Sequence, residues 1–530
     1  MEYYFSSSSG DDGHDGAAPS WDGTHGPWKT LAKAGAATFS AGDRILLKCG
    51  DEWNEQLTVN SHGNRASCGM PENPIEISSY GVGDKPKILR DMPTDMNKAQ
   101  FCIQIFEASG WKITNLEIGR STYGIDFHYS TQGNSHIFVD SCHFRDVAHR
   151  NMAGPPWMNE YGFSSAVQIS GERRIDLGSP YVSDVTVQNC TSQNSKSLFY
   201  NGTANLEFLA HTVKNVALRN NRTYGGTWGW CLHCVDGGIV ENCVSLNAGL
   251  EYFEIGAAGA VVFGCRDVDI TNCEFGYTKF VGTDGVGFDF EGRNSNVRLM
   301  NCEIHDNEDN GILTYANNGS NYNCAVYNCR MLRDCYGTGE GHTGFTLAGG
   351  RADLFRNDDG MLIAYLCSDK NPDSWLFPDK YNLENNYSNG TDPPPLATEG
   401  YPKSYSHCHE YVVYSGSRNG AAGIDSTGTD FARVGQARQT ERDGAWAQFT
   451  FLGTGIEFSA PKSDDQGDVD IYVDGGFCAT ASTYASDYAP LQAVFSKTDL
   501  PVGPHNIKIA KKSGGYMRIG EFKVYRNSSK

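Results

Sequence analysis

The sequence lacks three features that would assign it to other classes of protein. No apolar stretch reaches the roughly 18 residues that a membrane-spanning helix needs. Positive charge is scarce, with 43 Lys and Arg against 63 Asp and Glu and a net charge of -20, and no basic run offers a footprint for phosphates. Apolar residues at helical spacing are also scarce. We therefore expect no membrane partner, no nucleic-acid partner and an all-β fold.

A recognisable signal peptide is absent as well. Met1 is followed directly by Glu2 and Tyr3, which we interpret as a start that replaces a removed leader. We expect a secreted or cell-surface protein of a bacterium. The 17 cysteines leave at least one thiol unpaired, and six of them recur at one repeat position, so we expect these six to be reduced core residues rather than a disulfide scaffold.

The strongest positive signal is a repeat, typified by residues 281–304, VGTDGVGFDFEGRNSNVRLMNCEI. Its second strand ends in Asn-Cys, and this pair recurs at gaps of 53, 30, 29 and 27 residues, with Asn220-Asn221 dividing the first gap. Such periods are typical of stacked β coils. We predict a right-handed parallel β-helix with an internal Asn ladder and a stack of cysteines. The cysteines at this position are Cys142, Cys190, Cys243, Cys273, Cys302 and Cys329.

A first strand recurs too, for example GIDFHYS, AVQISG and GFDFEG. Read with period 2, Phe288 and Phe290 point inward while Asp289 and Glu291 point outward. Stacking these strands predicts an outward row that lines a groove. The predicted outward residues are Asp126, His128, Gln168, His233, Asp289, Glu291 and Tyr315.

A chain of 530 residues is too long for one compact core. We predict an N-terminal cap and first coils over 1–95, in which Trp28 to Leu31 start a short helix that closes the solenoid, and a β-helix over 96–367. A segment rich in Pro, Asn and Tyr over 368–408 is predicted as a linker or strap. Short strands with Gly and Asp turns over 409–530 predict a β-sandwich.

The SYG-x-G-x-KP element, SYGVGDKP at residues 79–86, resembles the N-terminal part of secreted bacterial β-helix enzymes of the pectate-lyase-like superfamily. The resemblance covers the cap and the coils to about residue 365, and it implies the fold and a glycan substrate. The C-terminal strands resemble the jelly-roll modules of bacterial glycan-degrading enzymes. That resemblance implies carbohydrate binding, and the alternative is a domain that only docks against the solenoid.

The densest acidic region predicts glycosidic cleavage by paired carboxylates. One carboxyl would donate a proton to the leaving oxygen while another, ionised, acts as nucleophile or base. We assign Asp289 as nucleophile or base and Glu291 or Asp309 as acid, with Asp284 tuning their pKa values or holding a sugar hydroxyl. Coil and strand spacings permit both the retaining and the inverting separation of the carboxyls.

Substrate contacts are predicted from acidic, His and aromatic residues near this row. They are His128, Trp157, Trp230, His233, Glu254, Asp306 and Tyr315. Three other interpretations compete: the acids cap turns at coil corners, the carboxylates bind Ca²⁺ in a chain that otherwise needs no cofactor or metal, or the Trp residues fasten loops to the solenoid.

Two other functions stay open. A polysaccharide lyase on a uronate glycan needs a basic residue, for which only Lys279 and Arg293 lie near in the sequence. A non-catalytic glycan-binding solenoid would not need the acidic cluster. Cys231 and Cys234 have zinc-like spacing, but no second pair follows and strand geometry separates them, so we expect core packing.

Overall fold

A computed structural model describes most of the chain. The described residues are 1–60, 66–91, 99–147, 164–171, 180–201, 212–250, 256–280, 284–314, 321–334, 345–346, 361–368, 382–388, 395–407, 412–415, 431–434 and 437–526. The chain divides into two compact units. Unit 1 comprises Met1–Asp289, Glu303–Gly311 and Arg333–His342, and unit 2 comprises Phe290–Cys302, Ile312–Leu332 and Thr343–Lys530.

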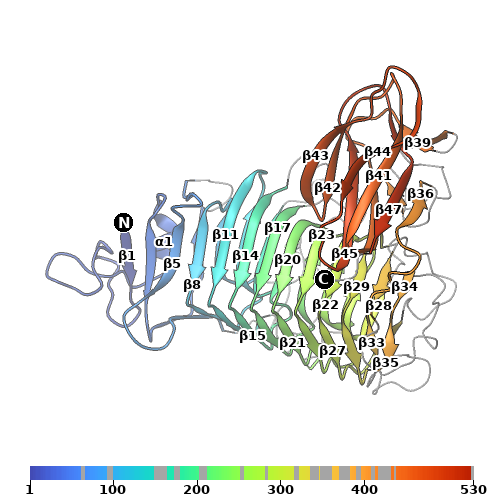
Figure 1. The fold of residues 1–530 in the computed structure, drawn as a ribbon. Coiled ribbons are helices and arrows are strands. Elements are labelled where there is room, and N and C mark those ends of the chain that lie inside the picture. The colour runs from blue at the N-terminus through green and yellow to red at the C-terminus, as the bar shows by residue number, and fades with distance from the viewer. Residues whose placement is uncertain are drawn as a thin grey trace. The chain divides into compact units, whose positions relative to one another are not determined.

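Unit 1 is a parallel β-helix, as predicted, and its described strands stack in chain order in three parallel sheets (Figure 1). Sheet A orders β1 (Glu2–Phe5), β2 (Arg44–Lys48), β5 (Ile75–Tyr80), β8 (Trp111–Thr114), β11 (Asn134–Asp140), β14 (Val182–Gln188), β17 (Val213–Arg219), β20 (Val235–Glu241) and β23 (Arg266–Thr271). Sheet B orders β3 (Glu52–Trp53), β6 (Lys87–Leu89), β9 (Glu117–Gly119), β12 (His143–Arg145), β15 (Thr191–Gln193), β18 (Arg222–Tyr224), β21 (Val244–Leu246), β24 (Glu274–Gly276) and β27 (Glu303–His305). Sheet C orders β4 (Leu57–Val59), β7 (Phe101–Phe106), β10 (Tyr123–Tyr129), β13 (Val167–Gly171), β16 (Phe199–Asn201), β19 (Trp228–His233), β22 (Ala257–Phe263) and β25 (Gly285–Phe290).

The corners between sheets A and B hold the predicted Asn ladder, but the ladder is external. Asn189, Asn220 and Asn242 adopt φ of 51°, 54° and 55°, the left-handed region that Asn tolerates better than most residues. Asn220 Nδ2 donates to Asn189 Oδ1 at 3.1 Å, and Asn242 Nδ2 donates to Asn220 Oδ1 at 3.4 Å. All three residues are exposed. The prediction of a buried ladder was wrong because the left-handed residue turns its amide outward and the following residue turns inward.

The cysteine stack is confirmed. The six cysteines at the repeat position are buried, and the structure leaves them as free thiols. Asn221 takes the place of the cysteine in the coil that divides the long gap, and it is buried too. Its Oδ1 accepts a hydrogen bond from Cys190 N at 3.0 Å, and its Nδ2 donates to Val187 O at 2.8 Å. The buried amide therefore has partners, which explains why Asn is tolerated among apolar thiols.

The short helix that we predicted near the N-terminus is α1 (Ala32–Ala36). It follows Leu31, which is buried together with Ala34. Gly35 lies so close to β4 that a methyl group there would meet Thr58 O at 2.9 Å. The helix therefore packs against the first strand of sheet C and covers its apolar residues, as the end of a solenoid requires.

Several connections into sheet C are long, although residues 120–122 and 225–227 make short ones, whereas those from sheet A to sheet B are mostly two residues. Residues 146–166 connect β12 to β13, residues 247–256 connect β21 to β22, and residues 277–284 connect β24 to β25. In contrast, only residues 141–142 connect β11 to β12. Since long loops on a rigid scaffold are where sites tend to be built, sheet C is the place to look for function.

Unit 2 contains the last coils and an antiparallel β-sandwich. Its coil strands are β26 (Ser295–Met300), β29 (Ala325–Tyr327), β32 (Leu362–Ala364) and β34 (Asn382–Glu384), then β30 (Arg330–Leu332), β33 (Cys367–Ser368) and β35 (Tyr387–Ser388), and β28 (Ile312–Thr314) and β31 (Phe345–Thr346). The sandwich orders β36 (Lys403–Ser406), β47 (Glu521–Tyr525), β41 (Gly455–Lys462) and β44 (Ala489–Lys497) in one sheet. A second sheet orders β37 (Val412–Tyr414), β40 (Trp446–Gly453), β45 (Gly503–Lys511), β42 (Asp468–Val473) and β43 (Gly476–Ser482), and a small one orders β38 (Ala432–Val434), β39 (Ala437–Thr440) and β46 (Met517–Ile519).

Within unit 2 the sandwich docks on the last coils through buried contacts. Leu452 of β40 packs against Ala325, Leu362 and Tyr365 of the coils. Beside this apolar contact, Arg298 of β26 donates from Nη1 to Asp474 Oδ1 at 2.7 Å. The docking alternative that we left open for the sandwich is therefore realised, and it does not exclude a ligand site elsewhere on the same sandwich.

Candidate active site

The outer face of sheet C in unit 1 carries one continuous row of side chains. Strand register aligns Gln104, Asp126, Gln168, Tyr200, Cys231 and Val261 on successive coils. A bond of 3.1 Å from Ala257 N to Asp284 O extends this register to β25 and sets Asp289 level with Val261. Asp289 thus lies on the outer face, as predicted.

Packing on the inner face of sheet C confirms that Asp289 points outward. The outer row of side chains does not line an open groove, however. Phe288 packs against Trp230 and Phe275, with ring centroids 6.1 and 5.4 Å away. The row residues are nevertheless at most 7% exposed, and Asp289 is 6% exposed. The expectation of a solvent-facing ledge was therefore wrong for these residues. Strand alternation reports only which way a side chain points, and it says nothing of what covers that face.

A buried polar network surrounds Asp126 on this face. Ser170 Oγ donates to Asp126 Oδ1 at 2.6 Å, Gln104 Nε2 donates to Oδ2 at 3.0 Å, and His128 Nδ1 lies 2.9 Å from Ser170 Oγ. Burial raises the pKa of Asp126, and the hydrogen bond from Ser170 only partly opposes this. Asp126 lies five coils from Asp289, about 24 Å at the usual strand spacing, so the two cannot act as an acid–base pair.

His233, predicted to contact substrate, is held by its neighbours on the same face. Tyr200 Oη lies 3.2 Å from His233 Nδ1, and the His233 backbone N donates to Asn201 Oδ1 at 2.8 Å. Burial lowers the pKa of His233 to about 4. The imidazole is therefore neutral at physiological pH and can contribute a hydrogen bond but not a positive charge.

At the edge where the sheet C strands begin, two of the four predicted catalytic acids come together. Asp309 N donates to Gly285 O at 3.1 Å, so Asp309 lies on the coil next to Asp284. Asp284 is half-buried and Asp309 is buried. The carboxylate of Asp284 rests against Gly256, where a methyl group would lie 2.0 Å from Oδ2. Glycine at this position leaves the space that this carboxylate occupies.

Asp289 stands at the far end of the same strand. Four residues separate it from Gly285, which is about 13 Å along an extended strand. That distance exceeds the roughly 6.5 to 9.5 Å of paired glycosidase carboxyls. The predicted pairing of Asp289 with Asp309 as its acid was therefore wrong, because Asp309 lies beside the first residue of β25 and Asp289 lies near the last.

An aromatic ring and a buried cation lie at the same edge, on the coils that precede Asp284. Trp228 is half-buried, and its Nε1 donates to Gly256 O at 3.1 Å. Lys196 Nζ lies 5.9 Å from the centre of the Trp228 ring. Burial lowers the pKa of Lys196 to about 8. We call Lys196, Trp228, Gly256, Asp284 and Asp309 the edge cluster.

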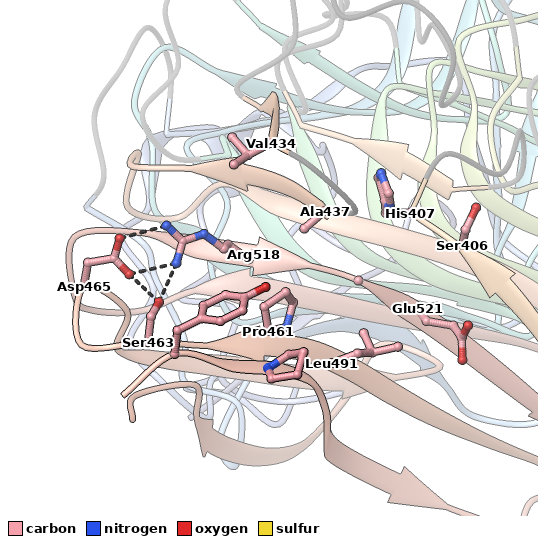
Figure 2. A pocket seen from close by; sticks show the side chains of 13 residues that line it. Ser406, His407, Val434, Ala437, Pro461, Ser463, Asp465, Leu491, Arg518 and Glu521 are labelled. Carbon is pink, nitrogen blue, oxygen red and sulfur yellow. Dashed lines mark hydrogen bonds and ion pairs between the residues drawn. The ribbon is translucent and has the colours of Figure 1, made fainter. Parts of the chain in front are cut away.

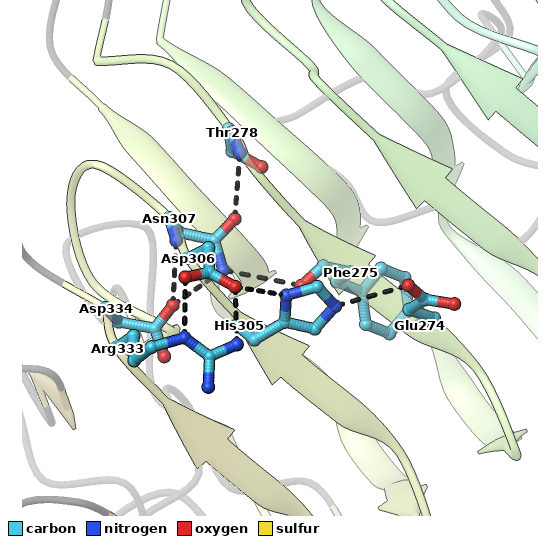
Figure 3. Close-up of polar contacts among 8 residues, drawn as sticks. All are labelled: Glu274, Phe275, Thr278, His305, Asp306, Asn307, Arg333 and Asp334. Carbon is cyan, nitrogen blue, oxygen red and sulfur yellow. Dashed lines mark hydrogen bonds and ion pairs between the residues drawn. The ribbon is translucent and has the colours of Figure 1, made fainter.

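Asp306 lies in a separate ion-pair network at the corner after sheet B (Figure 3). Arg333 binds its carboxylate with Nε at 2.7 Å and Nη2 at 2.6 Å, and His305 Nδ1 lies 2.8 Å from Oδ2. The hydrogen bond from Arg333 holds the pKa of Asp306 below its ordinary value. At φ of 55° Asp306 also forms the coil corner, which agrees with the alternative interpretation of a turn residue.

The other predicted site residues fall in three groups. Trp230 is 1% exposed and lies in the core, so the structure places it in packing and leaves no face for a sugar. Glu291 is half-buried and belongs to unit 2. Trp157, Glu254 and Tyr315 lie outside the described residues.

Sequence reasoning missed Lys196. The signal for it is weak: a lone Lys between two serines, SKS, just before the apolar strand LFY. Nothing in that pattern distinguishes it from a solvated surface lysine. Its importance arises only because the coil carries it next to Trp228.

Neither metal ligands nor a membrane span is evident in the part of the chain that the structure describes. No group of three or more His, Cys, Asp or Glu side chains there could hold a metal ion, and the Ca²⁺ alternative stays a prediction. None of the described helices has the length and apolar character needed to cross a membrane.

Comparisons with known proteins find short sequence matches and extended likeness in fold. No protein-family model matches the chain. An A type blood alpha-D-galactosamine galactosaminidase of Flavonifractor plautii is 32% identical over 80 residues, 15% of this chain and 7% of that protein. A lacto-N-biosidase of Bifidobacterium longum subsp. longum is 36% identical over 88 residues, 16% of this chain and 5% of that protein. The matches therefore span less than a tenth of the length of either curated relative.

Among solved structures, the GH136 lacto-N-biosidase from Eubacterium ramulus is similar to this chain with a TM-score of 0.51 and 16% identity. The likeness covers 73% of this chain and 66% of that one. It supports the parallel β-helix fold.

Proposed function

We propose that this protein is a glycoside hydrolase that cleaves a glycosidic bond of an oligo- or polysaccharide outside the cell, with Asp284 and Asp309 as its carboxylate pair. The observation that carries the proposal is their position on adjacent coils at the edge of sheet C, where Asp284 rests against Gly256 and the carbonyl of Gly256 accepts a hydrogen bond from the half-buried Trp228. Adjacent coils are about 4.8 Å apart, a backbone spacing that permits the separations of roughly 5 to 9.5 Å between carboxyls that glycosidases use.

We assign the two acids different chemical roles because their surroundings differ. Asp309 is buried and its Oδ1 accepts a hydrogen bond from Asn310 Nδ2 at 2.9 Å, so we assign it the role of general acid. Asp284 is half-buried, and we assign it the role of nucleophile or base. Trp228 offers an aromatic face to the apolar C–H face of a sugar ring. Asp289 with Glu291, two residues further along the chain, is the competing pair.

The short sequence matches support a glycan substrate. Both curated relatives are named for enzymes that act on sugars, a galactosaminidase and a lacto-N-biosidase. The acidic net charge of -20 also fits a neutral rather than a polyanionic substrate.

A substrate screen tests the proposal. Nitrophenyl glycosides of neutral hexoses and N-acetylhexosamines, and oligosaccharides that end in them, are incubated with the full chain with and without EDTA. Turnover that survives EDTA is expected. Absence of turnover on every neutral glycoside, together with new ultraviolet absorbance from unsaturated ends on uronate polymers, would instead identify a lyase.

The buried Lys196 favours a polysaccharide lyase as the second candidate function. A lyase needs a base to remove the proton at C5 of a uronate, and a lysine whose pKa is lowered to about 8 is suited to this. Lys279, the base that the sequence suggested, is less suitable because its Nζ pairs with Glu308 Oε1 at 2.9 Å. If the lyase is correct, Lys196→Met abolishes the ultraviolet signal while Lys279→Met keeps it.

Lys196→Met is also expected to stabilise the fold. The folded-state pKa of about 8 lies below the ordinary 10.5, so the charged form is disfavoured in the folded state. At pH 7 the free energy of unfolding should rise by up to about 3 kcal/mol in the variant, since each pKa unit corresponds to about 1.4 kcal/mol. In the wild type, stability from this group rises between about pH 8 and 10.5, where only the unfolded chain binds the proton.

Urea unfolding at pH 7 and pH 10 measures both effects. Lys214→Met on β17 is the control, because Lys214 is exposed and its replacement should change stability by less than about 0.5 kcal/mol. A Lys196→Met variant less stable than the wild type at pH 7 would contradict the prediction.

A further inference from the structure

The sandwich contains a pocket that the proposed catalytic chemistry does not use. Its volume is about 550 Å³, and it is lined by residues from β36, β38, β39, β41, β44, β46 and β47 and from the turns beside them (Figure 2). Pockets that hold small molecules typically measure about 300 to 1,000 Å³ and combine apolar walls with a few fixed polar groups. This pocket has both kinds of wall.

One wall is a fixed ion pair. Arg518 donates from Nη1 to Asp465 Oδ1 at 2.8 Å and from Nη2 to Asp465 Oδ2 at 2.8 Å, and Ser463 joins the pair (Figure 2). Arg518 Nε donates to Gln439 Oε1 at 3.1 Å. The hydrogen bond from Arg518 lowers the pKa of Asp465 to about 2, so the carboxylate is ionised at any physiological pH.

This pair still has hydrogen-bonding capacity. Among the described residues, four of the five N–H groups of Arg518 have acceptors, which leaves one on Nη2. Asp465 is 40% exposed at its side chain, and a carboxylate can accept about four hydrogen bonds. A donor and an acceptor thus lie side by side in a fixed plane, which suits two neighbouring hydroxyls, since each hydroxyl both donates and accepts.

Other parts of the lining are apolar and exposed. Tyr488 is 69% exposed, Leu491 45% and Val434 43%, and all three line the pocket. Large apolar side chains with this much exposure at one place mark a surface for a ligand. A ring with hydroxyls on its edge and C–H groups on its face matches both walls.

The charges of the pocket lining favour a neutral sugar ring over an acidic one. The charges of Asp465 and Arg518 cancel, and the lining also contains an acidic side chain, Glu521. A uronate or sulfated sugar would meet this carboxylate, whereas a neutral sugar would not.

We propose that this pocket is a second, non-catalytic carbohydrate site that binds a neutral pyranose, with neighbouring hydroxyls on Asp465 and Arg518 and the C–H face on Tyr488. It rests on the proposed function only in taking its ligand from the same kind of glycan. The binding itself does not require hydrolysis.

The test uses the full chain and calorimetric titration with methyl galactoside, methyl glucoside and methyl mannoside, and with methyl glucuronide as the charged comparison. At least one neutral probe should bind, and Tyr488→Ala and Asp465→Asn should each weaken it at least tenfold. Tyr484→Ala is the matched control, because Tyr484 is 55% exposed but does not line the pocket, and it should bind as the wild type does.

Activity separates this proposal from the catalytic one. Turnover of a nitrophenyl glycoside should be equal in the wild type, Tyr488→Ala and Asp465→Asn, and circular dichroism should show that each variant is folded. Binding of no neutral probe, binding that is equal in all variants, or tighter binding of the glucuronide would each overturn the site. A chain without hydrolase activity that still binds a probe through Tyr488 would support the site and contradict only the hydrolase.

Discussion

Replacing Asp284 or Asp309 by Asn is expected to lower kcat by about 10² to 10⁴-fold, the usual contribution of a positioned acid or base. Asn keeps the size of the side chain and cannot exchange the proton. The fold should persist, since each substitution keeps the size of the side chain and creates no cavity. Steady-state kinetics on the best substrate of the screen measures the loss.

The two variants should differ in their dependence on the leaving group. A nitrophenol leaves without protonation, so Asp309→Asn, which removes the general acid, should retain more activity on nitrophenyl glycosides than on natural oligosaccharides. Asp284→Asn should lose activity on both kinds of substrate. Glu303→Gln, at an exposed carboxylate on β27, is the matched control and should leave kcat unchanged.

Asp289→Asn and Glu291→Gln decide between the two acidic pairs. If these variants lose turnover while Asp284→Asn and Asp309→Asn retain it, the site lies at the far end of β25 and the edge cluster is structural. Unchanged turnover in all four variants would remove both assignments.

Arg298→Ala is expected to destabilise unit 2 by about 1 to 3 kcal/mol, less than the roughly 3 to 5 kcal/mol of a fully buried pair, because it leaves the half-buried carboxylate of Asp474 without its cation. Arg298 is 8% exposed, and besides Asp474 its Nη1 donates to Pro504 O at 3.2 Å. Asp474 also lies 2.7 Å from His505 Nδ1 and accepts from Asn506 N at 2.9 Å. One side chain thus connects β26 of the coils to two strand ends of the sandwich.

Denaturant unfolding of the full chain measures this loss. Arg330→Ala, at an exposed arginine on β30, is the control and should change stability by less than about 0.5 kcal/mol. The double variant Arg298→Met with Asp474→Asn should recover part of the loss, since neither charge then stays buried. Equal stability of Arg298→Ala and the control would show that the ion pair does not hold the sandwich on the coils.

The same ion pair predicts a pH dependence. Burial works to raise the pKa of Asp474, but the hydrogen bond from His505 and the charge of Arg298 outweigh it and hold the pKa below its ordinary 3.8. A carboxyl with a lowered folded-state pKa stabilises the fold above the unfolded value and loses this contribution as the pH falls. The difference between wild type and Asp474→Asn should therefore be constant above about pH 5 and shrink below pH 4.

Much of the solenoid could be predicted from the sequence because its pattern is local. Period-2 alternation decides which side chains point inward, so Phe288 and the stacked cysteines were placed correctly. The Asn-Cys pair marked each corner, since Asn tolerates the left-handed conformation that a tight corner needs. The local sequence pattern does not determine whether the Asn amide turns into the solenoid or out of it. The prediction of a buried ladder was accordingly wrong.

Which residues form the candidate site depends on the distances between coils and on what covers the outer face of sheet C. Residues 309 and 289 are twenty apart in sequence, and only the hydrogen bond that sets Asp309 beside the start of β25 shows that they cannot pair. Lys196 and Trp228 become neighbours only because their coils stack. By itself, the sequence determined the repeat, the β-helix, the β-sandwich and the acidic region, because these depend on alternation and turn residues. The tertiary structure alone decided that Asp284 and Asp309 lie on adjacent coils, that the outer row is buried, and that the sandwich docks on the last coils with Arg298 paired to Asp474. Those outcomes depend on register and burial between segments that no local pattern relates.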